Sequence, residues 1–178
     1  MQHNGLFVAL TGLSGSGKTT IAKGAQEILE SKGYKVDLVD ENKYCQTVCS
    51  DLNLSSEEGQ EENINRLSFI AQRKAKGRRI VILAAVNPYA STQNVCKDRG
   101  AVLVHVFCPF DVCRERDPEG LYKKHGDHQM PGGQATGAFR FDDPGFNCLA
   151  IFTDSTNPQR AQKDCAKDLA RIILCHFI

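Results

Sequence analysis

Eight residues close to the amino terminus restrict the possible folds of this chain more than any other feature. Residues 12–19 read GLSGSGKT and satisfy the pattern GxxxxGK(S/T) at every fixed position. An apolar run at 6–11 precedes them, and apolar residues at helical spacing follow over 19–32. This order of buried strand, glycine-rich loop and helix is typical of the phosphate-binding loop (P-loop) of α/β proteins.

The residue types in this loop suit the binding of a nucleoside triphosphate. The glycines let successive backbone N–H groups turn toward an anion, and the helix N-terminus adds its positive end. Lys18 can reach the β- and γ-phosphates, and Thr19 can supply a hydroxyl ligand to Mg²⁺. The predicted ATP-binding residues of the loop are Gly12, Ser14, Gly15, Ser16, Gly17, Lys18, Thr19 and Thr20.

The rest of the chain alternates between strand-like and helix-like segments. Apolar runs of strand length lie at 34–39, 79–86, 102–107 and 148–152, and helical patterns lie at 64–76, 111–124 and 161–177. This alternation predicts one α/β domain over residues 1–178, with a mostly parallel central sheet between two layers of helices. A long polar and glycine-rich stretch within 116–147 is predicted to be a lid segment.

Composition narrows the possible functions. The 178 residues include 22 Lys and Arg against 21 Asp and Glu, a formal net charge of +1. This balance argues against nucleic-acid binding through a basic face, and no apolar run approaches the ~20 residues of a membrane span. The amino terminus lacks the basic region of a secretion signal, so we expect a cytoplasmic protein whose partners are small molecules. The eight cysteines show no CxxC or zinc spacing, which favours reduced thiols.

The end of the second predicted strand carries candidate catalytic residues. Asp40 and Glu41 follow this strand, and ligands of open α/β sheets bind at the carboxyl ends of strands. A kinase needs a carboxylate near the acceptor hydroxyl, whereas these residues with Asn42 could also be a solvated strand end and helix cap. Lys123 and Lys124 suit a basic lid or an ordinary exposed helix end. The sequence has no NKxD motif, which disfavours a GTPase.

Six segments together resemble one family, the adenylylsulfate (APS) kinases. They read LTGLSGSGKTT at 10–20, EENINR at 61–66, NPY at 87–89, VCRERDPEGLYKK at 112–124, TG at 136–137 and TDS at 153–155. The resemblance implies an enzyme that uses ATP and Mg²⁺ to phosphorylate the 3′-hydroxyl of APS, forming the sulfate donor PAPS. It also implies a homodimer.

The resemblance further implies roles for individual residues. Lys18 and Glu41 are the implied catalytic residues, Thr19 is the implied Mg²⁺ ligand, and Arg116 is an implied ATP contact on the lid side. The implied substrate-binding residues are Asp40, Asn42, Tyr44, Asn63, Arg66, Val86, Asn87, Pro88, Tyr89, Lys123, Lys124, Thr136 and Gly137.

The acceptor side departs from the family pattern. The family motif DGDN-x-R appears as VDENKY at 39–44, so Glu41 replaces the catalytic aspartate and Tyr44 replaces an arginine. Gln60 replaces a second arginine, and Leu54 and Ala135 replace two phenylalanines that sandwich adenine in the family. Each lost guanidinium contact or stacked ring weakens binding by about 1–3 kcal/mol. Three hypotheses stay open: an APS kinase with an altered acceptor site, a related kinase for another nucleotide conjugate or small metabolite, and a non-catalytic nucleotide-sensing module.

Overall fold

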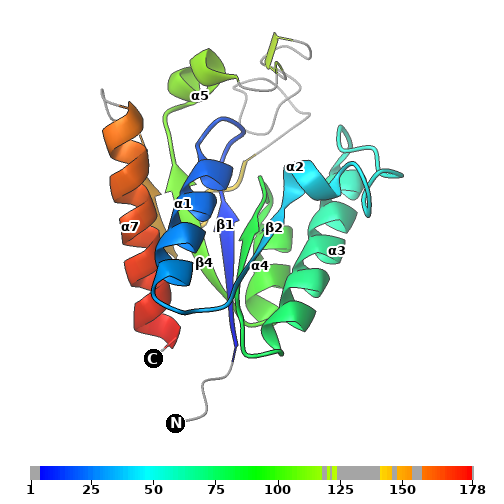
Figure 1. Ribbon diagram of the computed structural model, residues 1–178. Coiled ribbons are helices and arrows are strands. Elements are labelled where there is room, and N and C mark those ends of the chain that lie inside the picture. The colour runs from blue at the N-terminus through cyan, green and yellow to red at the C-terminus, as the bar shows by residue number, and fades with distance from the viewer. Residues whose placement is uncertain are drawn as a thin grey trace.

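The computed structural model describes residues 5–117, 120, 122–123, 141–145, 148–153 and 158–177, the side chains of 158–161 excepted. Its centre is a five-stranded sheet in the order β2-β3-β1-β4-β5, and every pair of neighbours is parallel. The strands are β1 (Leu6–Thr11), β2 (Val36–Asp40), β3 (Ile80–Ala84), β4 (Ala101–Phe107) and β5 (Leu149–Phe152). The predicted parallel sheet is confirmed (Figure 1).

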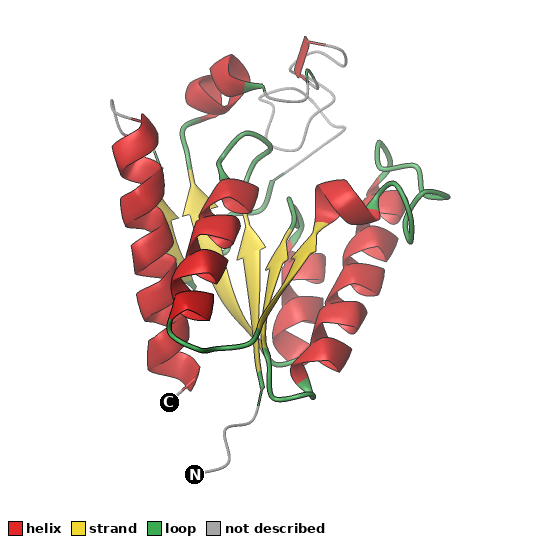
Figure 2. Cartoon of the chain, viewed as in Figure 1, coloured by secondary structure: helices red, strands yellow, loops and turns green. Residues whose placement is uncertain are grey.

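Helices cover both faces of this sheet. α1 (Lys18–Ser31) and α7 (Pro158–Phe177) pack on one face, and α3 (Glu57–Ala75) and α4 (Ala90–Asp98) pack on the other (Figures 1 and 2). Successive strand side chains point to opposite faces. In β1, Val8 and Leu10 therefore join the apolar cluster of α1 and α7, while Phe7 and Ala9 join that of α3. The three-layer α/β/α arrangement agrees with the prediction.

Three helices differ from the prediction: the extents of α3 and α5 differ, and α4 was not predicted. α3 begins at Glu57 rather than near residue 64, because the hydroxyl of Ser56 accepts a hydrogen bond from the N–H of Gly59 and caps a polar first turn. α4 is absent from the prediction, since it is short and mostly polar and has little apolar periodicity. α5 (Phe110–Arg116) ends before the predicted residue 124, at Asp117, whose carboxylate accepts the N–H of Tyr122.

The carboxyl ends of three neighbouring strands, β2, β3 and β1, meet at the edge of the sheet where the P-loop lies (Figure 1). β1 leads into the P-loop, β2 into the short helix α2 (Glu41–Tyr44), and β3 into residues 85–89. Donor and acceptor candidates therefore share the edge at which open α/β sheets bind ligands.

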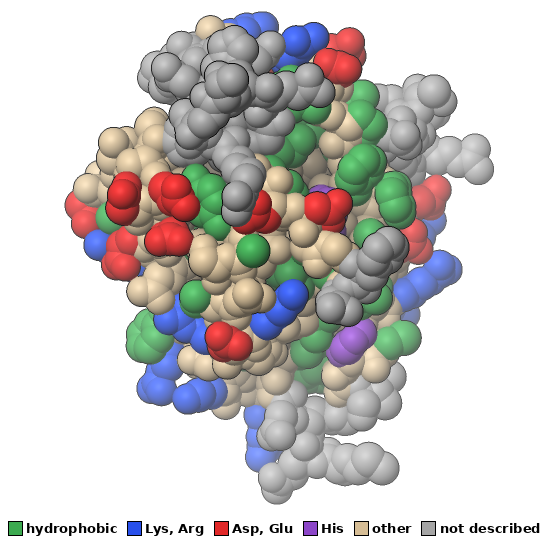
Figure 3. All heavy atoms as spheres, turned by 180° about the vertical axis from the view of Figure 1, so that it is seen from behind, with side chains coloured by type: hydrophobic (Ala, Val, Ile, Leu, Met, Phe, Trp, Pro, Cys, Tyr) green, Lys and Arg blue, Asp and Glu red, His purple; other side chains and the backbone are tan. Residues whose placement is uncertain are grey.

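The first half of α3 is acidic. The view from behind shows acidic side chains gathered on its left, the side of α3 (Figure 3). The acidic residues in the first half of this helix are Glu57, Glu58, Glu61 and Glu62.

Two expectations from composition can be compared with the structure. All eight cysteines have free thiols. Burial raises the pKa of Cys96 to about 12, so that thiol stays protonated at neutral pH. Within the described ranges, no helix is long and apolar enough to cross a membrane.

Candidate active site

The backbone of the P-loop takes a path that only glycine follows without strain. Gly15 has φ +78°, and Gly17, the residue before α1, has φ +95°. A Cβ added at Gly12 would lie 2.4 Å from the carbonyl oxygen of Val106 in β4. A Cβ at Gly15 would lie 2.6 Å from the carbonyl oxygen of Cys113 in α5. The loop is therefore packed directly against two neighbouring elements.

Replacing Gly15 by Ala is expected to disturb this packing. The left-handed φ costs a non-glycine residue about 1–2 kcal/mol, and the contact with Cys113 forces a further shift. We expect ADP affinity, measured by calorimetry, to fall about tenfold or more, equivalent to ~1.4 kcal/mol. Gly33→Ala is the matched control, because Gly33 has φ +86° but no atom within 4 Å of an added Cβ. Wild-type ADP affinity in Gly15→Ala would contradict this account of the loop.

Lys18 opens α1, and its ammonium group lies within the P-loop. Its Nζ donates hydrogen bonds to the carbonyl oxygens of Gly12 at 2.9 Å and Leu13 at 2.7 Å. The next residue, Thr19, donates its hydroxyl hydrogen to Oδ1 of Asp40 at 3.2 Å. A cation, a hydroxyl group and a helix N-terminus thus lie together, an arrangement suited to polyphosphate binding.

Side chains from distant segments hold the P-loop in place. Tyr122 donates its hydroxyl hydrogen to the carbonyl of Ser14 at 2.9 Å, and Thr153 donates its own to the carbonyl of Ser16 at 2.9 Å. Nη2 of Arg116 donates to the carbonyl of Thr153 at 2.8 Å, and its Nη1 lies 3.4 Å from the carbonyl of Gly15. Neither Tyr122 nor Thr153 was among the predicted site residues, although both stand in segments that carry the family resemblance.

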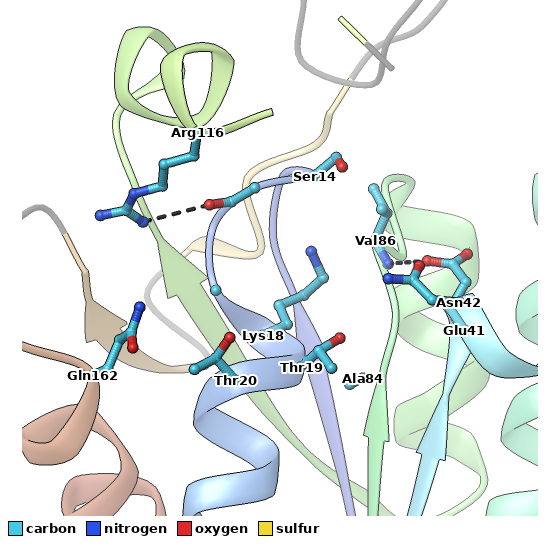
Figure 4. A pocket seen from close by; sticks show the side chains of 12 residues that line it. Ser14, Lys18, Thr19, Thr20, Glu41, Asn42, Ala84, Val86, Arg116 and Gln162 are labelled. Carbon is cyan, nitrogen blue, oxygen red and sulfur yellow. Dashed lines mark hydrogen bonds between the residues drawn. The ribbon is translucent and has the colours of Figure 1, made fainter. Parts of the chain in front are cut away.

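Glu41 is anchored by two N–H donors from different segments. Its Oε1 accepts a hydrogen bond from Nδ2 of Asn63 on α3 at 2.6 Å. Its Oε2 accepts one from the backbone N–H of Val86, after β3, at 2.8 Å (Figure 4). The residue is only 8% exposed. Two N–H donors suit an ionised carboxylate and fix its direction, so three segments of the chain converge on this group.

One cavity joins the P-loop and Glu41. Its volume is about 290 Å³, and its lining residues are Ser14, Gly15, Gly17, Lys18, Thr19, Thr20, Glu41, Asn42, Ala84, Val86, Arg116 and Gln162. Figure 4 shows the Lys18 side chain between Glu41 and Asn42 on one side and Arg116 on the other. The structure therefore brings the P-loop, the second-strand carboxylate and Arg116 together, as a phosphoryl-transfer site requires.

Four buried polar atoms have no hydrogen-bond partner in the part of the chain that the structure describes. They are Oε1 of Gln60, Oδ1 of Asn63, Oδ1 of Asn87 and the hydroxyl of Tyr89. All four belong to α3 or to the loop after β3, the two segments that hold Glu41. An unpaired buried polar atom costs about 1–3 kcal/mol, so such atoms commonly meet a ligand or an ordered water. These two segments form the candidate acceptor side.

The loop after β3 is itself held from two directions. The carbonyl of Asn87 accepts the hydroxyl hydrogen of Thr11 at 2.8 Å, and the carbonyl of Pro88 accepts the N–H of Asp142 at 2.7 Å. The carboxylate of Asp142 accepts in turn the N–H of Ala90 at 2.9 Å. Thr11 and Asp142 thus fix the segment that reaches Glu41. Thr11 stands in the LTGLSGSGKTT segment, whereas Asp142 stands in none of the quoted motifs.

Some of the predicted residues lie away from the cavity. Arg66 pairs with Asp51 at 2.6 Å and Glu62 at 2.8 Å and holds the loop between α2 and α3, and it does not line the cavity. Tyr44 packs against the apolar cluster beneath α3, and the side chain of Lys123 is exposed. Lys124, Ala135, Thr136 and Gly137 lie outside the described residues, with most of the predicted lid.

The P-loop follows the first strand of a parallel sheet and faces an anchored carboxylate across one cavity. This arrangement defines the class of P-loop phosphotransferases. The family model for adenylylsulphate kinase matches residues 4–143 of the chain. The "Probable adenylyl-sulfate kinase" of Synechocystis sp. is 32% identical over 174 residues, covering 97% of this chain and 89% of the relative. The chain belongs to the adenylylsulfate kinase family.

Two further comparisons agree with this family. The "Probable adenylyl-sulfate kinase" of Pseudomonas aeruginosa is 33% identical over 126 residues, which cover 70% of this chain and 58% of that relative. The solved structure of the Mycobacterium tuberculosis APS kinase CysC with AMPPNP and APS has a TM-score of 0.76 and 28% identity. The structural match covers 93% of this chain and 99% of the CysC chain. This protein is thus an ATP-dependent phosphotransferase with a hydroxyl acceptor.

Proposed function

We propose that this protein transfers the γ-phosphoryl group of ATP to the 3′-hydroxyl of adenylylsulfate, forming PAPS and ADP. The observation that carries the proposal is the shared cavity of Lys18 and Glu41, with Asn63 of the EENI segment anchoring that carboxylate. The Mycobacterium tuberculosis relative was solved with AMPPNP, an analogue of ATP, and APS bound together, so a related fold accommodates a nucleotide donor analogue beside APS.

The P-loop is the proposed ATP site. During transfer, negative charge spreads over the γ-phosphoryl oxygens, where Lys18 and the loop N–H groups stabilise it. Phosphate oxygens would replace the carbonyl oxygens of Gly12 and Leu13 as partners of the Lys18 ammonium. The donors present fit Mg²⁺, because the Thr19 hydroxyl and the Asp40 carboxylate are the hard oxygen groups that it prefers. When bound, Mg²⁺ neutralises charge on the β- and γ-phosphates.

Glu41 is the proposed base of the acceptor side. Its carboxylate orients the acceptor hydroxyl and takes the proton as the new O–P bond forms and the bond to ADP breaks in line. Glutamate is one methylene longer than the aspartate of the family motif, and the N–H groups of Asn63 and Val86 hold the longer side chain against the end of β3. We assign acceptor contacts to Asn42, Asn63 and the main chain of residues 86–89.

Two further parts of the proposal follow from family membership. Residues 116–147 are the proposed lid, and Arg116 is its described residue that lines the cavity and would contact ATP. The proposed assembly is a homodimer, which sedimentation equilibrium tests directly.

The deciding experiment is a coupled assay of ADP release from Mg·ATP, with and without APS. We expect ADP release that depends on APS, together with PAPS detected by chromatography. ADP release at the background rate would contradict APS as the acceptor, and a screen of hydroxylated nucleotides and small metabolites would then identify the substrate class.

The charges on the acceptor side favour a second candidate function. In this alternative the protein phosphorylates another nucleotide conjugate or a small metabolite. Tyr44 and Gln60 stand where the family has arginines, and Arg66 already pairs with two carboxylates. The first half of α3 is also acidic (Figure 3). These features lower the attraction for an anionic phosphosulfate group.

Restoring the two arginines tests how far this substitution pattern controls the acceptor. In Tyr44→Arg/Gln60→Arg we expect APS affinity to rise about tenfold or more, since a hydrogen bond to a charged group contributes ~1.5–3 kcal/mol. Calorimetric titration with APS in the presence of Mg·ADP measures the change. Asn65→Arg, at an exposed position of α3, is the control for added charge alone. An equal rise in that control, or no rise in the double variant, would contradict this account of the acceptor side.

A further inference from the structure

We propose that Cys108 and Cys113 form a redox site beside the P-loop. A small disulfide compound oxidises the two thiols to one disulfide bond, and this bond lowers the affinity of the P-loop for nucleotide. The proposal rests on the proposed binding of ATP at the P-loop but not on the identity of the acceptor. It gives a function to two buried thiols that take no part in phosphoryl transfer.

The two thiols lie together at the start of α5. Cys108 follows β4 and is 4% exposed, and Cys113 lies within α5 and is fully buried. With Tyr122 they form a small apolar cluster of their own, separate from the two clusters that cover the sheet. A hydrogen bond joins Cys113 to the side chain of Cys108, and the Cys113 sulfur lies 3.8 Å from the Cys108 carbonyl oxygen. Thiols this close can be joined with only a small movement of the chain.

The two sulfur atoms differ in their surroundings. Nη1 of Arg116 donates a hydrogen bond to Sγ of Cys108 at 3.4 Å. A cation beside a sulfur favours the thiolate, which is the form that attacks a disulfide. By contrast, the hydrogen bond with Cys108 and burial raise the pKa of Cys113, so that thiol keeps its proton. Cys108 is therefore the first nucleophile, and Cys113 completes the reaction.

The oxidation consists of two thiol–disulfide exchanges. The Cys108 thiolate attacks one sulfur of the small disulfide, so that one thiolate leaves and a mixed disulfide remains on the protein. Cys113 then attacks the Cys108 sulfur of this mixed disulfide, and the second thiol leaves with the proton that Cys113 gives up. The protein loses two electrons and two protons, and the compound is reduced to two thiols. A small compound is required because both sulfur atoms are buried.

The thiol pair contacts the P-loop in two ways. A Cβ added at Gly15 would lie 2.6 Å from the carbonyl oxygen of Cys113, so the loop backbone lies directly against this residue. Arg116, the partner of Cys108, also donates to the carbonyl of Gly15 at 3.4 Å and lines the nucleotide cavity (Figure 4). An S–S bond of about 2.05 Å is much shorter than a contact between two thiols, so closing it must move one of the residues. We expect this movement to displace Gly15 and Arg116.

The test compares the complete protein before and after oxidation with glutathione disulfide. The intact mass should fall by two hydrogen atoms without a glutathione adduct, and peptide mapping should place the bond between Cys108 and Cys113. Calorimetry should then show an ADP affinity about tenfold or more below that of the reduced protein, since a misplacement of ~1 Å in a binding site can cost up to ~10²-fold. Reduction with dithiothreitol should restore the affinity.

Variants show whether this pair carries the response. Cys108→Ser keeps an acceptor for Arg116 but cannot form the bond, so its ADP affinity should be equal within about twofold under reducing and oxidising conditions. Cys113→Ser should behave in the same way, and either variant serves if the other melts far below the wild type. Cys175→Ser removes an exposed thiol and is the matched control that should keep the full response. No bond, a bond between other cysteines, or unchanged ADP affinity after oxidation would overturn the proposal.

A redox titration of the wild type tests the same coupling in the opposite direction. If the disulfide lowers ADP affinity tenfold, saturating Mg·ADP must oppose disulfide formation tenfold, because linkage is reciprocal. The midpoint potential in glutathione buffers should therefore rise by about 30 mV with Mg·ADP, and an unchanged midpoint would refute the coupling. A protein that binds Mg·ADP but releases none from ATP with APS refutes the proposed acceptor and leaves the redox site assigned, whereas no binding of Mg·ADP refutes both.

Discussion

Lys18→Ala is expected to reduce kcat for APS-dependent ADP release by about 10³-fold or more. Lys18 is the P-loop cation that lines the cavity, and removing one charge donor from a transition state of this kind costs at least ~10²–10³ in rate. The fold should survive, because the hydrogen bonds of the ammonium group to the carbonyls of Gly12 and Leu13 lie within the P-loop rather than in the apolar core. We expect the melting temperature to change by no more than about 4 °C.

Lys23→Ala is the matched control for this variant. Lys23 lies on the same helix with an exposed side chain, so its removal changes the net charge equally and should leave kcat within about twofold. Turnover close to wild type in Lys18→Ala would refute the assignment of the P-loop as the catalytic donor site.

Glu41→Gln is expected to lower kcat by about 10²–10⁴-fold, the usual contribution of a positioned general base. ADP affinity should change far less, because the carboxylate accepts hydrogen bonds from Asn63 on α3 and from Val86 after β3, both outside the P-loop. The amide is not structurally silent, since both partners of Glu41 are N–H donors and a carboxamide must turn its own NH₂ toward one of them. We therefore also expect the free energy of unfolding to fall by about 1–3 kcal/mol.

Two variants separate catalysis from stability at this position. Asn63→Ala removes one of the same hydrogen bonds but keeps the carboxylate, so it should lose a similar amount of stability and much less kcat. Glu58→Gln makes the same exchange at an exposed position of α3 and should change neither. If Glu41→Gln keeps kcat within tenfold of wild type, Glu41 is not the base.

Much of the donor side could be predicted from sequence. The eight P-loop residues are contiguous in sequence. The glycines of this loop stand where the backbone has a positive φ or where an added Cβ would clash with a neighbouring element, so the motif itself indicates the loop conformation. Apolar runs of strand length predicted the parallel sheet, because strands buried on both faces are apolar throughout. Glu41 was placed near the P-loop by the rule that strand ends share one edge, and the cavity contains both.

The acceptor side shows why prediction from sequence stopped short. Arg66 stands in a motif of the family, yet Asp51 and Glu62 already occupy its guanidinium group. Those ion pairs depend on the conformation of the loop between α2 and α3, which no periodic pattern in the sequence predicts. Asp40 was predicted as a substrate contact, but its carboxylate accepts the Thr19 hydroxyl, because its side chain lies on the face of β2 toward α1.

Sequence patterns were enough to predict the phosphate-binding loop, the alternating α/β architecture and a carboxylate after the second strand. These features follow from local backbone preference and from burial patterns, which neighbouring residues express directly. The anchoring of that carboxylate became visible with the packed fold. Its hydrogen-bond donors are Asn63 and the N–H of Val86, which lie 22 and 45 residues along the chain from Glu41. Such contacts arise when whole elements pack, so their partners are selected by the shape and hydrogen bonding of the assembled core rather than by adjacent residues.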